Sequence, residues 1–285
     1  MTKTLPQWFR QDIISSKARC RLKEIKINTV CEEAHCPNFS ACLEKNRLTV
    51  MILGDTCTRS CAFCAIKKSP DKVLPLDTEE PLRVAKEIRR LGIKYVVLTS
   101  VTRDDLPDGG AQIYERTIKL IKHYCSGIII EVLIPDFKGS EAALKTVIDS
   151  GPQVLAHNIE TVRRLYPVVR PGADYDISLR LLSSVKKHSR GLLSKSSIML
   201  GMGETLFELL AAMEDLRVAG CDIITFGQYL APDKEHYQVK EFISPQEFES
   251  LKEKAIKMGF RACLSGPLVR SSYQAEEIYG QLVRT

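Results

Sequence analysis

The sequence predicts an α/β protein in which a parallel sheet carries helices on its outer side. The 285-residue chain has a globular composition, with 44% apolar and 27% charged residues. From residue 47 onward, short apolar runs alternate with segments of helical periodicity, and a group of cysteines follows the first run. Such alternation implies a parallel sheet. An incomplete (β/α) barrel and a doubly wound sheet both fit, because periodicity does not reveal strand order.

Six apolar runs are expected to be the strands of this sheet. The first is LTVMIL at residues 48–53, which Gly54 and Asp55 terminate. Runs of the same kind predict further strands at 95–98, 128–134, 154–156, 197–200 and 222–226.

Helices are expected between these strands. Apolar residues at helical spacing predict helices that begin near Thr78, run through 113–124 and 141–148, lie within 162–188 and span about 205–218. Gly220 is a natural C-terminal stop for the last of these. The result is six β–α units.

Two extensions flank this central unit, so we divide the chain into three parts. Residues 1–46 form an N-terminal extension with cysteines and little strand signal, and residues 47–240 form the barrel-like unit. Residues 241–285 hold one helix at about 245–258, capped by Ser244, and a polar RSSY run at 270–273.

Charge and hydropathy exclude several classes. The net charge of +6 is spread along the chain, whereas nucleic-acid binders show dense basic stripes, so we expect no nucleic-acid partner. No apolar run reaches the length of a membrane span, and the N-terminus has no secretory apolar stretch. We therefore expect a cytoplasmic protein without membrane contact, in a reducing compartment where clustered cysteines indicate metal or redox chemistry.

Cys57, Cys61 and Cys64 form a C-x3-C-x2-C group directly after the first predicted strand. The carboxyl ends of parallel strands are where functional groups collect. Three thiolates on one short loop can hold three corners of a 4Fe-4S cluster and leave one iron open. A zinc site is the alternative, but zinc usually takes two separated ligand pairs.

This triplet, with Phe63 before its last cysteine, resembles the radical S-adenosylmethionine superfamily. The resemblance implies that S-adenosylmethionine chelates the open iron through its amino and carboxylate groups. Electron transfer then cleaves it to methionine and a 5′-deoxyadenosyl radical, which abstracts hydrogen from unactivated carbon.

A second triplet, Cys31, Cys36 and Cys42, narrows the resemblance to the lipoyl synthase family. His35, inside this triplet, is more simply a loop residue than a ligand. Leu43 departs from the family, which often has tryptophan there. Matching runs cover most of the chain: CEEAHCPN, MILGDTCTRSCAFC, TSVTRDDLPDGG, EVLIPDF, HNIETVRRLYPVVRP, SIMLGMGE, GQYLAP and RSSY.

The resemblance implies a partial (β/α)6 TIM-type barrel and two 4Fe-4S clusters. Cys57, Cys61 and Cys64 would hold the catalytic cluster. Cys31, Cys36 and Cys42 would hold an auxiliary cluster, with Ser272 as its fourth ligand. An alkoxide is a harder ligand than the thiolates and should be easier to displace.

The reaction implied is insertion of two sulfur atoms, at carbons 6 and 8 of an octanoyl chain on a carrier-protein lysine. The auxiliary cluster would donate the sulfur. Implied partners are octanoylated lipoyl domains of 2-oxoacid dehydrogenase acyltransferase subunits or the glycine-cleavage H protein. An electron donor such as ferredoxin or flavodoxin and an iron–sulfur cluster carrier are also implied.

Polar residues at the ends of the predicted strands are candidates to bind S-adenosylmethionine: Thr99, Ser100, Asn158, Arg170, Gly201 and Glu204. Arg170 and Arg164 could each pair with a carboxylate, and either could equally make a surface ion pair. The acidic loop of Asp104, Asp105 and Asp108 could hold a metal, although a turn and helix cap is the simpler interpretation.

Other interpretations remain at this point. A methylthiotransferase shares the C-x3-C-x2-C triplet but usually carries a nucleic-acid-binding module. Biotin synthase has similar chemistry with differently arranged auxiliary ligands. A non-catalytic electron carrier would need four strong ligands per cluster.

Overall fold

A single sheet of seven parallel strands forms the centre of the molecule in the computed structural model, which describes residues 5–9, 25–34, 36–69 and 75–284. Its strands are β1 (Thr49–Ile52), β4 (Tyr95–Ser100), β5 (Ile129–Leu133), β6 (Val154–Ala156), β7 (Leu193–Leu200), β8 (Ile223–Gln228) and β9 (Ala262–Gly266).

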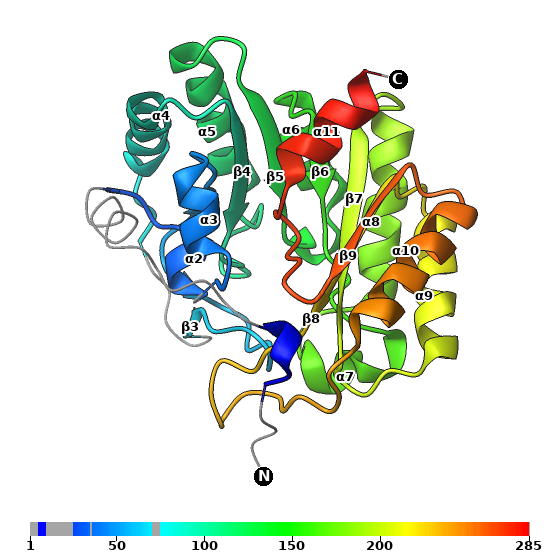
Figure 1. Ribbon diagram of the computed structural model, residues 1–285. Helices are drawn as coiled ribbons and strands as arrows, with labels where there is room; N and C mark the ends of the chain where they lie inside the picture. The colour runs from blue at the N-terminus through cyan, green and yellow to red at the C-terminus, as the bar shows by residue number, and fades with distance from the viewer. Residues whose placement is uncertain (1–4, 10–24, 35, 70–74, 285) are drawn as a thin grey trace.

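The strands lie side by side in chain order, from β1 at one edge to β9 at the other. A doubly wound sheet would reverse this order at a switch point. The sequential order therefore distinguishes between the two architectures and confirms the partial barrel. Figure 1 shows the curved sheet with its helices outside and an open side between α3 and the C-terminal segment.

The sheet contains seven strands, one more than the six that the sequence predicts. β9 pairs with β8 along its whole length, with Ile223 opposite Ala262 and Gly227 opposite Gly266. Its sequence, ACLSG, is half-buried throughout and has no alternating pattern. Only its pairing with β8 distinguishes it from a loop, so the sequence did not predict it.

The strand β7 begins at Leu193 rather than at residue 197. Its first half contains the polar run SKS, which suggests a loop, yet these side chains are buried. Lys195 forms an ion pair with Glu131 of β5, its Nζ lying 2.8 Å from Oε1. A buried charge is tolerated only when it is paired, so a tertiary contact made this polar stretch a strand.

The expected helices are confirmed, with ends shifted by a few residues. They are α4 (Glu80–Leu91), α5 (Ala111–Tyr124), α6 (Glu141–Asp149), α7 (Tyr166–Val169), α8 (Tyr175–His188), α9 (Leu206–Val218) and α10 (Pro245–Lys257), with 3-10 turns η1 (Gln7–Phe9), η2 (Phe137–Gly139) and η3 (Arg163–Leu165).

Capping chemistry explains where several of these helices start and stop. α9 begins with a capping box between Thr205 and Glu208, and α10 begins with one between Ser244 and Glu247. Gly220, at φ +80°, follows the end of α9 as expected. None of the described helices is long and apolar enough to cross a membrane.

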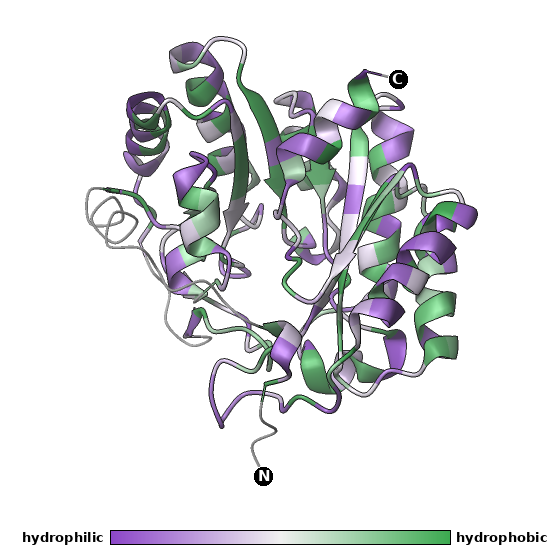
Figure 2. Ribbon diagram, in the orientation of Figure 1, coloured by the Kyte–Doolittle hydropathy of each residue, from purple (hydrophilic) through white to green (hydrophobic). Residues whose placement is uncertain are grey.

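Apolar side chains fill the space between the sheet and its helices. Figure 2 shows hydrophobic strands β4 and β5 with helices that carry both hydrophobic and hydrophilic residues. Two large clusters form this core, one centred on β1, β4 and β5 and the other on β7 and β8.

The open side of the barrel is covered by segments from both ends of the chain. The N-terminal part contributes α2 (Val30–Glu33) and α3 (Phe39–Glu44), and the C-terminal part contributes α11 (Ala275–Val283). Figure 1 shows α11 and the segment before it facing α2 and α3. Arg47, just after α3, forms ion pairs with Glu276 and Glu277 of α11. Two parts of the chain more than 200 residues apart therefore build one local structure.

Candidate functional site

The loop that follows β1 carries Cys57, Cys61 and Cys64. Cys57 lies in β2 (Thr56–Cys57), which pairs with β3 (Lys67–Lys68) and closes the base of the loop. The loop starts where Leu53 and Gly54 adopt positive φ, and their N–H groups donate to the buried carboxylate of Glu80 on α4. The sheet and α4 thus fix where the cysteine loop begins.

Backbone hydrogen bonds hold the rest of this loop. Thr58 N–H donates to the carbonyl of Thr102 at 3.0 Å, and Ala62 N–H donates to Val169 at the end of α7 at 2.9 Å. On the other side, Tyr237 N–H donates to the Ala62 carbonyl at 2.9 Å. The loop therefore touches the segments after β4, β6 and β8 and is pre-organised by them.

Arg59, between the first two cysteines, is the strongest of these attachments. Its guanidinium makes two hydrogen bonds each to Asp104 and to Asp136, at 2.6–3.0 Å, and only 7% of its side chain is exposed. Burial alone would raise the pKa of Asp136, but the Arg59 guanidinium lowers it to about 2. Bidentate pairs of this kind are rigid as well as strong.

The three thiols of the loop sit in a shielded environment. Burial raises the pKa of the Cys64 thiol to about 12 and also raises that of Cys61, which the Arg170 guanidinium opposes. The Cys57 sulfur accepts hydrogen bonds from the N–H groups of Arg59 and Thr102, each at 3.4 Å. Thiols that resist ionisation while metal-free become thiolate ligands when iron supplies the compensating charge.

Arg170 and Asn158 lie beside this loop with unused polar atoms. One Arg170 nitrogen donates to the main-chain oxygens of Asn158 and Ile159 and to the Tyr166 hydroxyl. Within the part of the chain that the structure describes, its buried Nε has no hydrogen-bond partner, and neither has the buried Oδ1 of Asn158. Buried polar atoms are normally paired, so these two atoms fit a polar ligand next to the cysteines.

Glu160 belongs to the same corner and was missed from the sequence. It holds a positive φ of 65°, accepts a hydrogen bond from the Asn158 amide at 3.0 Å, and bridges to Ile198 of β7. Burial raises its pKa and Arg170 opposes the shift. Its place within the run HNIETVRR was the available signal, whereas its backbone conformation was not predictable.

Gly201 and Glu204 shape the turn after β7. Both Glu204 oxygens accept main-chain hydrogen bonds, from Gly201 at 2.6 Å and from Met202 at 2.9 Å. A side chain on Gly201 would lie 2.2 Å from the Glu241 carbonyl oxygen and 2.3 Å from the Gln228 amide nitrogen. These residues therefore position the rim of the barrel, and direct ligand contact by Glu204 stays a prediction.

Thr99 and Ser100 end β4 next to β1. The Thr99 hydroxyl donates to the Leu133 carbonyl of β5 at 2.9 Å, which fixes that side chain within the sheet. Ser100 lies opposite Ile52, the last residue of β1, immediately before the cysteine loop.

The remaining polar candidates have structural partners. Arg164 pairs with Glu208 at the start of α9, so it makes the surface ion pair. Asp104 holds Arg59, Asp105 holds Arg103, and Asp108 accepts the N–H groups at the start of α5. The acidic loop is thus an anchor and a helix cap.

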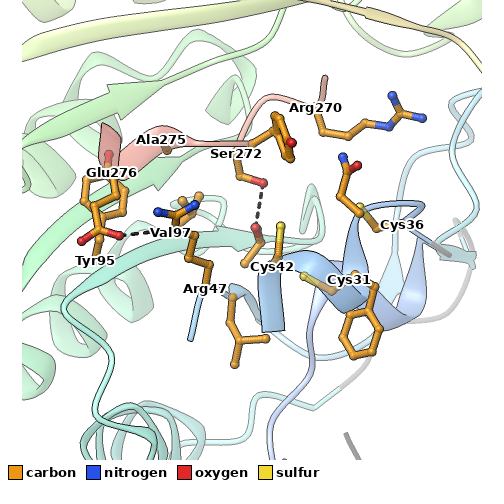
Figure 3. A pocket seen from close by; sticks show the side chains of 15 residues that line it. Cys31, Cys36, Cys42, Arg47, Tyr95, Val97, Arg270, Ser272, Ala275 and Glu276 are labelled. Atoms are coloured by element: carbon orange, nitrogen blue, oxygen red, sulfur yellow. Dashed lines mark hydrogen bonds and ion pairs between the residues drawn. The ribbon is translucent and has the colours of Figure 1, made fainter. Parts of the chain in front are cut away.

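The other triplet lines a separate pocket on the open side of the barrel. Cys31 lies on α2, Cys42 on α3 and Cys36 in the turn between them, while His35 lies outside the described residues. Ser272 lines the same pocket, together with Arg270 and Tyr273, and Ser271 does not. Figure 3 shows the three sulfurs and the Ser272 hydroxyl facing one another across it.

The thiols of this pocket are also shielded and close enough to repel one another as thiolates. Burial raises the pKa of Cys31 to about 12 despite a hydrogen bond from the Thr49 main chain, and Cys36 and Cys42 raise it further. Burial raises the pKa of Cys42 to about 11. Three such thiols can ionise together only around a cation, so the pocket fits a metal cluster.

Neither triplet is arranged as a site for a single metal ion. Among the described residues, no three His, Cys, Asp or Glu side chains surround one point as a single metal ion requires. A cluster presents a different iron to each ligand, so its ligands need not converge on one point. The structure thus brings each predicted triplet together in its own place, and Ser272 lies only with Cys31, Cys36 and Cys42.

Comparisons with known proteins agree with this arrangement. Residues 51–216 match the family model of the radical SAM superfamily. The lipoyl synthase of Caldanaerobacter subterraneus subsp. tengcongensis is 48% identical over 97% of both chains. The lipoyl synthase of Thermus thermophilus is 50% identical over 96% of this chain and 86% of its own.

Solved structures extend the likeness in fold. Methylornithine synthase superposes with a TM-score of 0.55 at 18% identity, covering 77% of this chain and 65% of its own. Identity this low supports the fold alone, whereas the curated relatives are about 50% identical over nearly the whole chain. The chain therefore belongs to the lipoyl synthase family of radical S-adenosylmethionine enzymes.

Proposed function

We propose that this enzyme inserts two sulfur atoms, at carbons 6 and 8 of an octanoyl chain carried on a lysine of a lipoyl domain, and so completes protein lipoylation. One observation supports the proposal: the two cysteine triplets occupy separate places, and a serine from the far end of the chain lines the pocket of Cys31, Cys36 and Cys42. A cluster with a displaceable ligand suits a sulfur donor, while an electron carrier would favour four strong ligands.

The two sites have different tasks in this proposal. When bound, a 4Fe-4S cluster at Cys57, Cys61 and Cys64 with S-adenosylmethionine would supply hydrogen-abstracting radical chemistry, and one at Cys31, Cys36, Cys42 and Ser272 would supply sulfur. The chain's own residues keep these functions apart. Arg59 and Glu80 hold the first loop rigid, while the pocket of the second lies under the C-terminal segment.

Asn158 and Arg170 are the residues that we expect to contact S-adenosylmethionine directly. Both have a buried polar atom without a partner, and Arg170 lies near Cys61. A guanidinium suits a carboxylate and an amide oxygen suits an ammonium group, which are the two groups expected at the open iron. Thr99 and Ser100 at the end of β4 and Gly201 and Glu204 after β7 are the further residues that we propose for this site.

The partners follow from this chemistry. Octanoylated lipoyl domains are the substrates, and we propose acyltransferase subunits of 2-oxoacid dehydrogenases or the glycine-cleavage H protein as their source. A low-potential donor such as ferredoxin or flavodoxin would supply electrons, and an iron–sulfur cluster carrier would restore the spent cluster. A cytoplasmic, reducing environment suits the nine described cysteines, all of which are free thiols.

The test uses the anaerobically reconstituted enzyme with an octanoyl-lysine peptide, S-adenosylmethionine and a strong reductant. We expect mass spectrometry to show a peptide that has gained two sulfur atoms. Formation of 5′-deoxyadenosine with an unchanged peptide would refute the proposed substrate. An absence of 5′-deoxyadenosine in a preparation that holds both clusters would refute the enzyme function.

A further inference from the structure

Thr49 lines the pocket that holds Cys31, Cys36, Cys42 and Ser272, which we call the auxiliary pocket. Its hydroxyl donates a hydrogen bond to the Ser272 Oγ, with 2.8 Å between the oxygens. In Figure 3 this hydrogen bond is the dashed line that starts at the Ser272 hydroxyl. One residue of the sheet thus shares the pocket with the three cysteines and is hydrogen-bonded to the serine.

The position of Thr49 is fixed by the sheet. It is the first residue of β1, lies opposite Val97 of β4, and is only 7% exposed. The neighbouring Val50 forms a bridge to Thr29, the residue that caps α2. Thr49 therefore stands on the rigid side of the pocket, next to the helix that carries Cys31.

Ser272 lies on a less regular segment. After β9 the chain turns back over β8, where Gly227 leaves room for it: a side chain there would lie 2.1 Å from the Val269 carbonyl oxygen. Asn38 donates a hydrogen bond to the Leu268 carbonyl at 2.6 Å, upstream of Ser272. The contact at the serine side chain itself comes from Thr49.

We propose that Thr49 is a positioning residue for Ser272, holding its oxygen toward the three thiols both before it binds iron and while it is a ligand. This inference rests on the proposed role of Ser272 as fourth ligand. When the iron–oxygen bond forms, the serine proton leaves to solvent; when the bond breaks, the oxygen takes up a proton again. Thr49 remains a hydrogen-bond donor throughout and undergoes no net chemical change.

Thr49 can hold Ser272 in place because its hydrogen bond becomes stronger when the serine oxygen that accepts it carries a charge. Hydrogen bonds to ionised oxygens are shorter and stronger than those between neutral groups. Thr49 would thus stabilise the iron-bound serine more than the free one. It would also keep a displaced serine within reach of the cluster, since its own position depends on β1 and not on the cluster.

The test measures how tightly the auxiliary cluster holds its serine-bound iron. The triple variant Cys57→Ala, Cys61→Ala and Cys64→Ala serves as background, because only the auxiliary cluster can load in it. Two readouts apply: the rate at which a chelator removes iron, and the electron paramagnetic resonance signal of a three-iron form after mild oxidation. Neither readout requires turnover.

In this background, Thr49→Val should speed loss of the first iron roughly tenfold, the size expected for one hydrogen bond to a charged group. Thr49→Ser keeps the hydroxyl and should behave as the parent. Ser272→Ala should be at least as fast as Thr49→Val, and Ser271→Ala should match the parent. The double variant of Thr49→Val with Ser272→Ala should lose iron no faster than Ser272→Ala alone.

The outcomes separate this inference from the proposed function. If Ser272→Ala accelerates iron loss and Thr49→Val does not, the role of Thr49 is refuted and the serine ligand stands. If Ser272→Ala has no effect, the ligand assignment fails first. If the double variant is faster than Ser272→Ala by the full Thr49→Val effect, Thr49 acts on packing and not through the serine. Thr49→Ala repeats the test if valine prevents folding.

Discussion

Arg59→Met should strongly destabilise the protein, although this residue is neither a ligand nor part of the apolar core. Its guanidinium pairs with Asp104 and with Asp136, and Asp136 is only 2% exposed. Methionine fills similar space but leaves the Asp136 carboxylate buried without its cation. The substitution therefore removes the cation of a buried ion pair and leaves its anion in place.

The magnitude follows from the pKa of Asp136. It falls from 3.8 to about 2 in the folded protein, which corresponds to about 2 kcal/mol of stability at neutral pH. Removing one partner of a buried pair typically costs about 3–5 kcal/mol, because the remaining charge is uncompensated. We therefore expect Arg59→Met to lower the free energy of unfolding by about 2–5 kcal/mol.

The sign of the pH dependence gives a second check. A carboxylate with a lowered pKa stabilises the folded state above its unfolded pKa and loses that contribution as the pH falls through its folded pKa. The difference between wild type and Arg59→Met should therefore be full near neutral pH and shrink between about pH 4 and pH 2. Urea unfolding of the metal-free proteins, followed by circular dichroism, measures both quantities.

Arg83→Met is the matched control. Arg83 also pairs with an aspartate, Asp77, but the two side chains are 50% and 53% exposed. Exposed pairs contribute little, so this variant should unfold nearly as the wild type does. If Arg59→Met were no more destabilising than Arg83→Met, the argument from burial and pairing would be wrong.

Three further predictions concern the site. Cys57→Ala should abolish both 5′-deoxyadenosine formation and sulfur insertion, while Cys31→Ala should keep some 5′-deoxyadenosine formation and insert no sulfur; identical behaviour in both assays would contradict the division of tasks. Gly201→Ala should lower the melting temperature markedly, because its methyl group would lie 2.2 Å from a main-chain oxygen at a φ of +88°, whereas Gly191→Ala meets nothing within 4 Å and should not. Asn158→Ala should weaken S-adenosylmethionine binding roughly tenfold in the reconstituted enzyme, measured by equilibrium dialysis, and unchanged affinity would remove Asn158 from the ligand site.

The sequence predicted most of the helices and strands because apolar runs and helix caps can be recognised within a few consecutive residues. Strands such as β1 are continuous apolar runs, and the capping box of Ser244 and Glu247 marks the start of α10 within four residues. The polar first half of β7 and the featureless β9 were missed. Each is a strand because of a partner elsewhere: Lys195 through Glu131, and β9 through β8.

The candidate site divides in the same way. The cysteine spacings indicated clusters, and the resemblance assigned Ser272 to the triplet of Cys31, Cys36 and Cys42. No spacing could show that Arg59 reaches the loops after β4 and β5, or that Glu160 adopts a positive φ beside Asn158. Both depend on contacts between distant segments, as does the hydrogen bond from Thr49 to Ser272 across 223 positions of the chain.

The sequence by itself determined the fold class, the family and the identity of both cysteine triplets, because apolar periodicity and cysteine spacing are written within short stretches of chain. Only the tertiary structure decided strand order, the seventh strand and the auxiliary pocket. A pocket formed by α2, α3, β1 and the segment before α11 exists only after the two ends of the chain have met across the open side of the barrel. Long-range packing decides that meeting, and no local pattern encodes it.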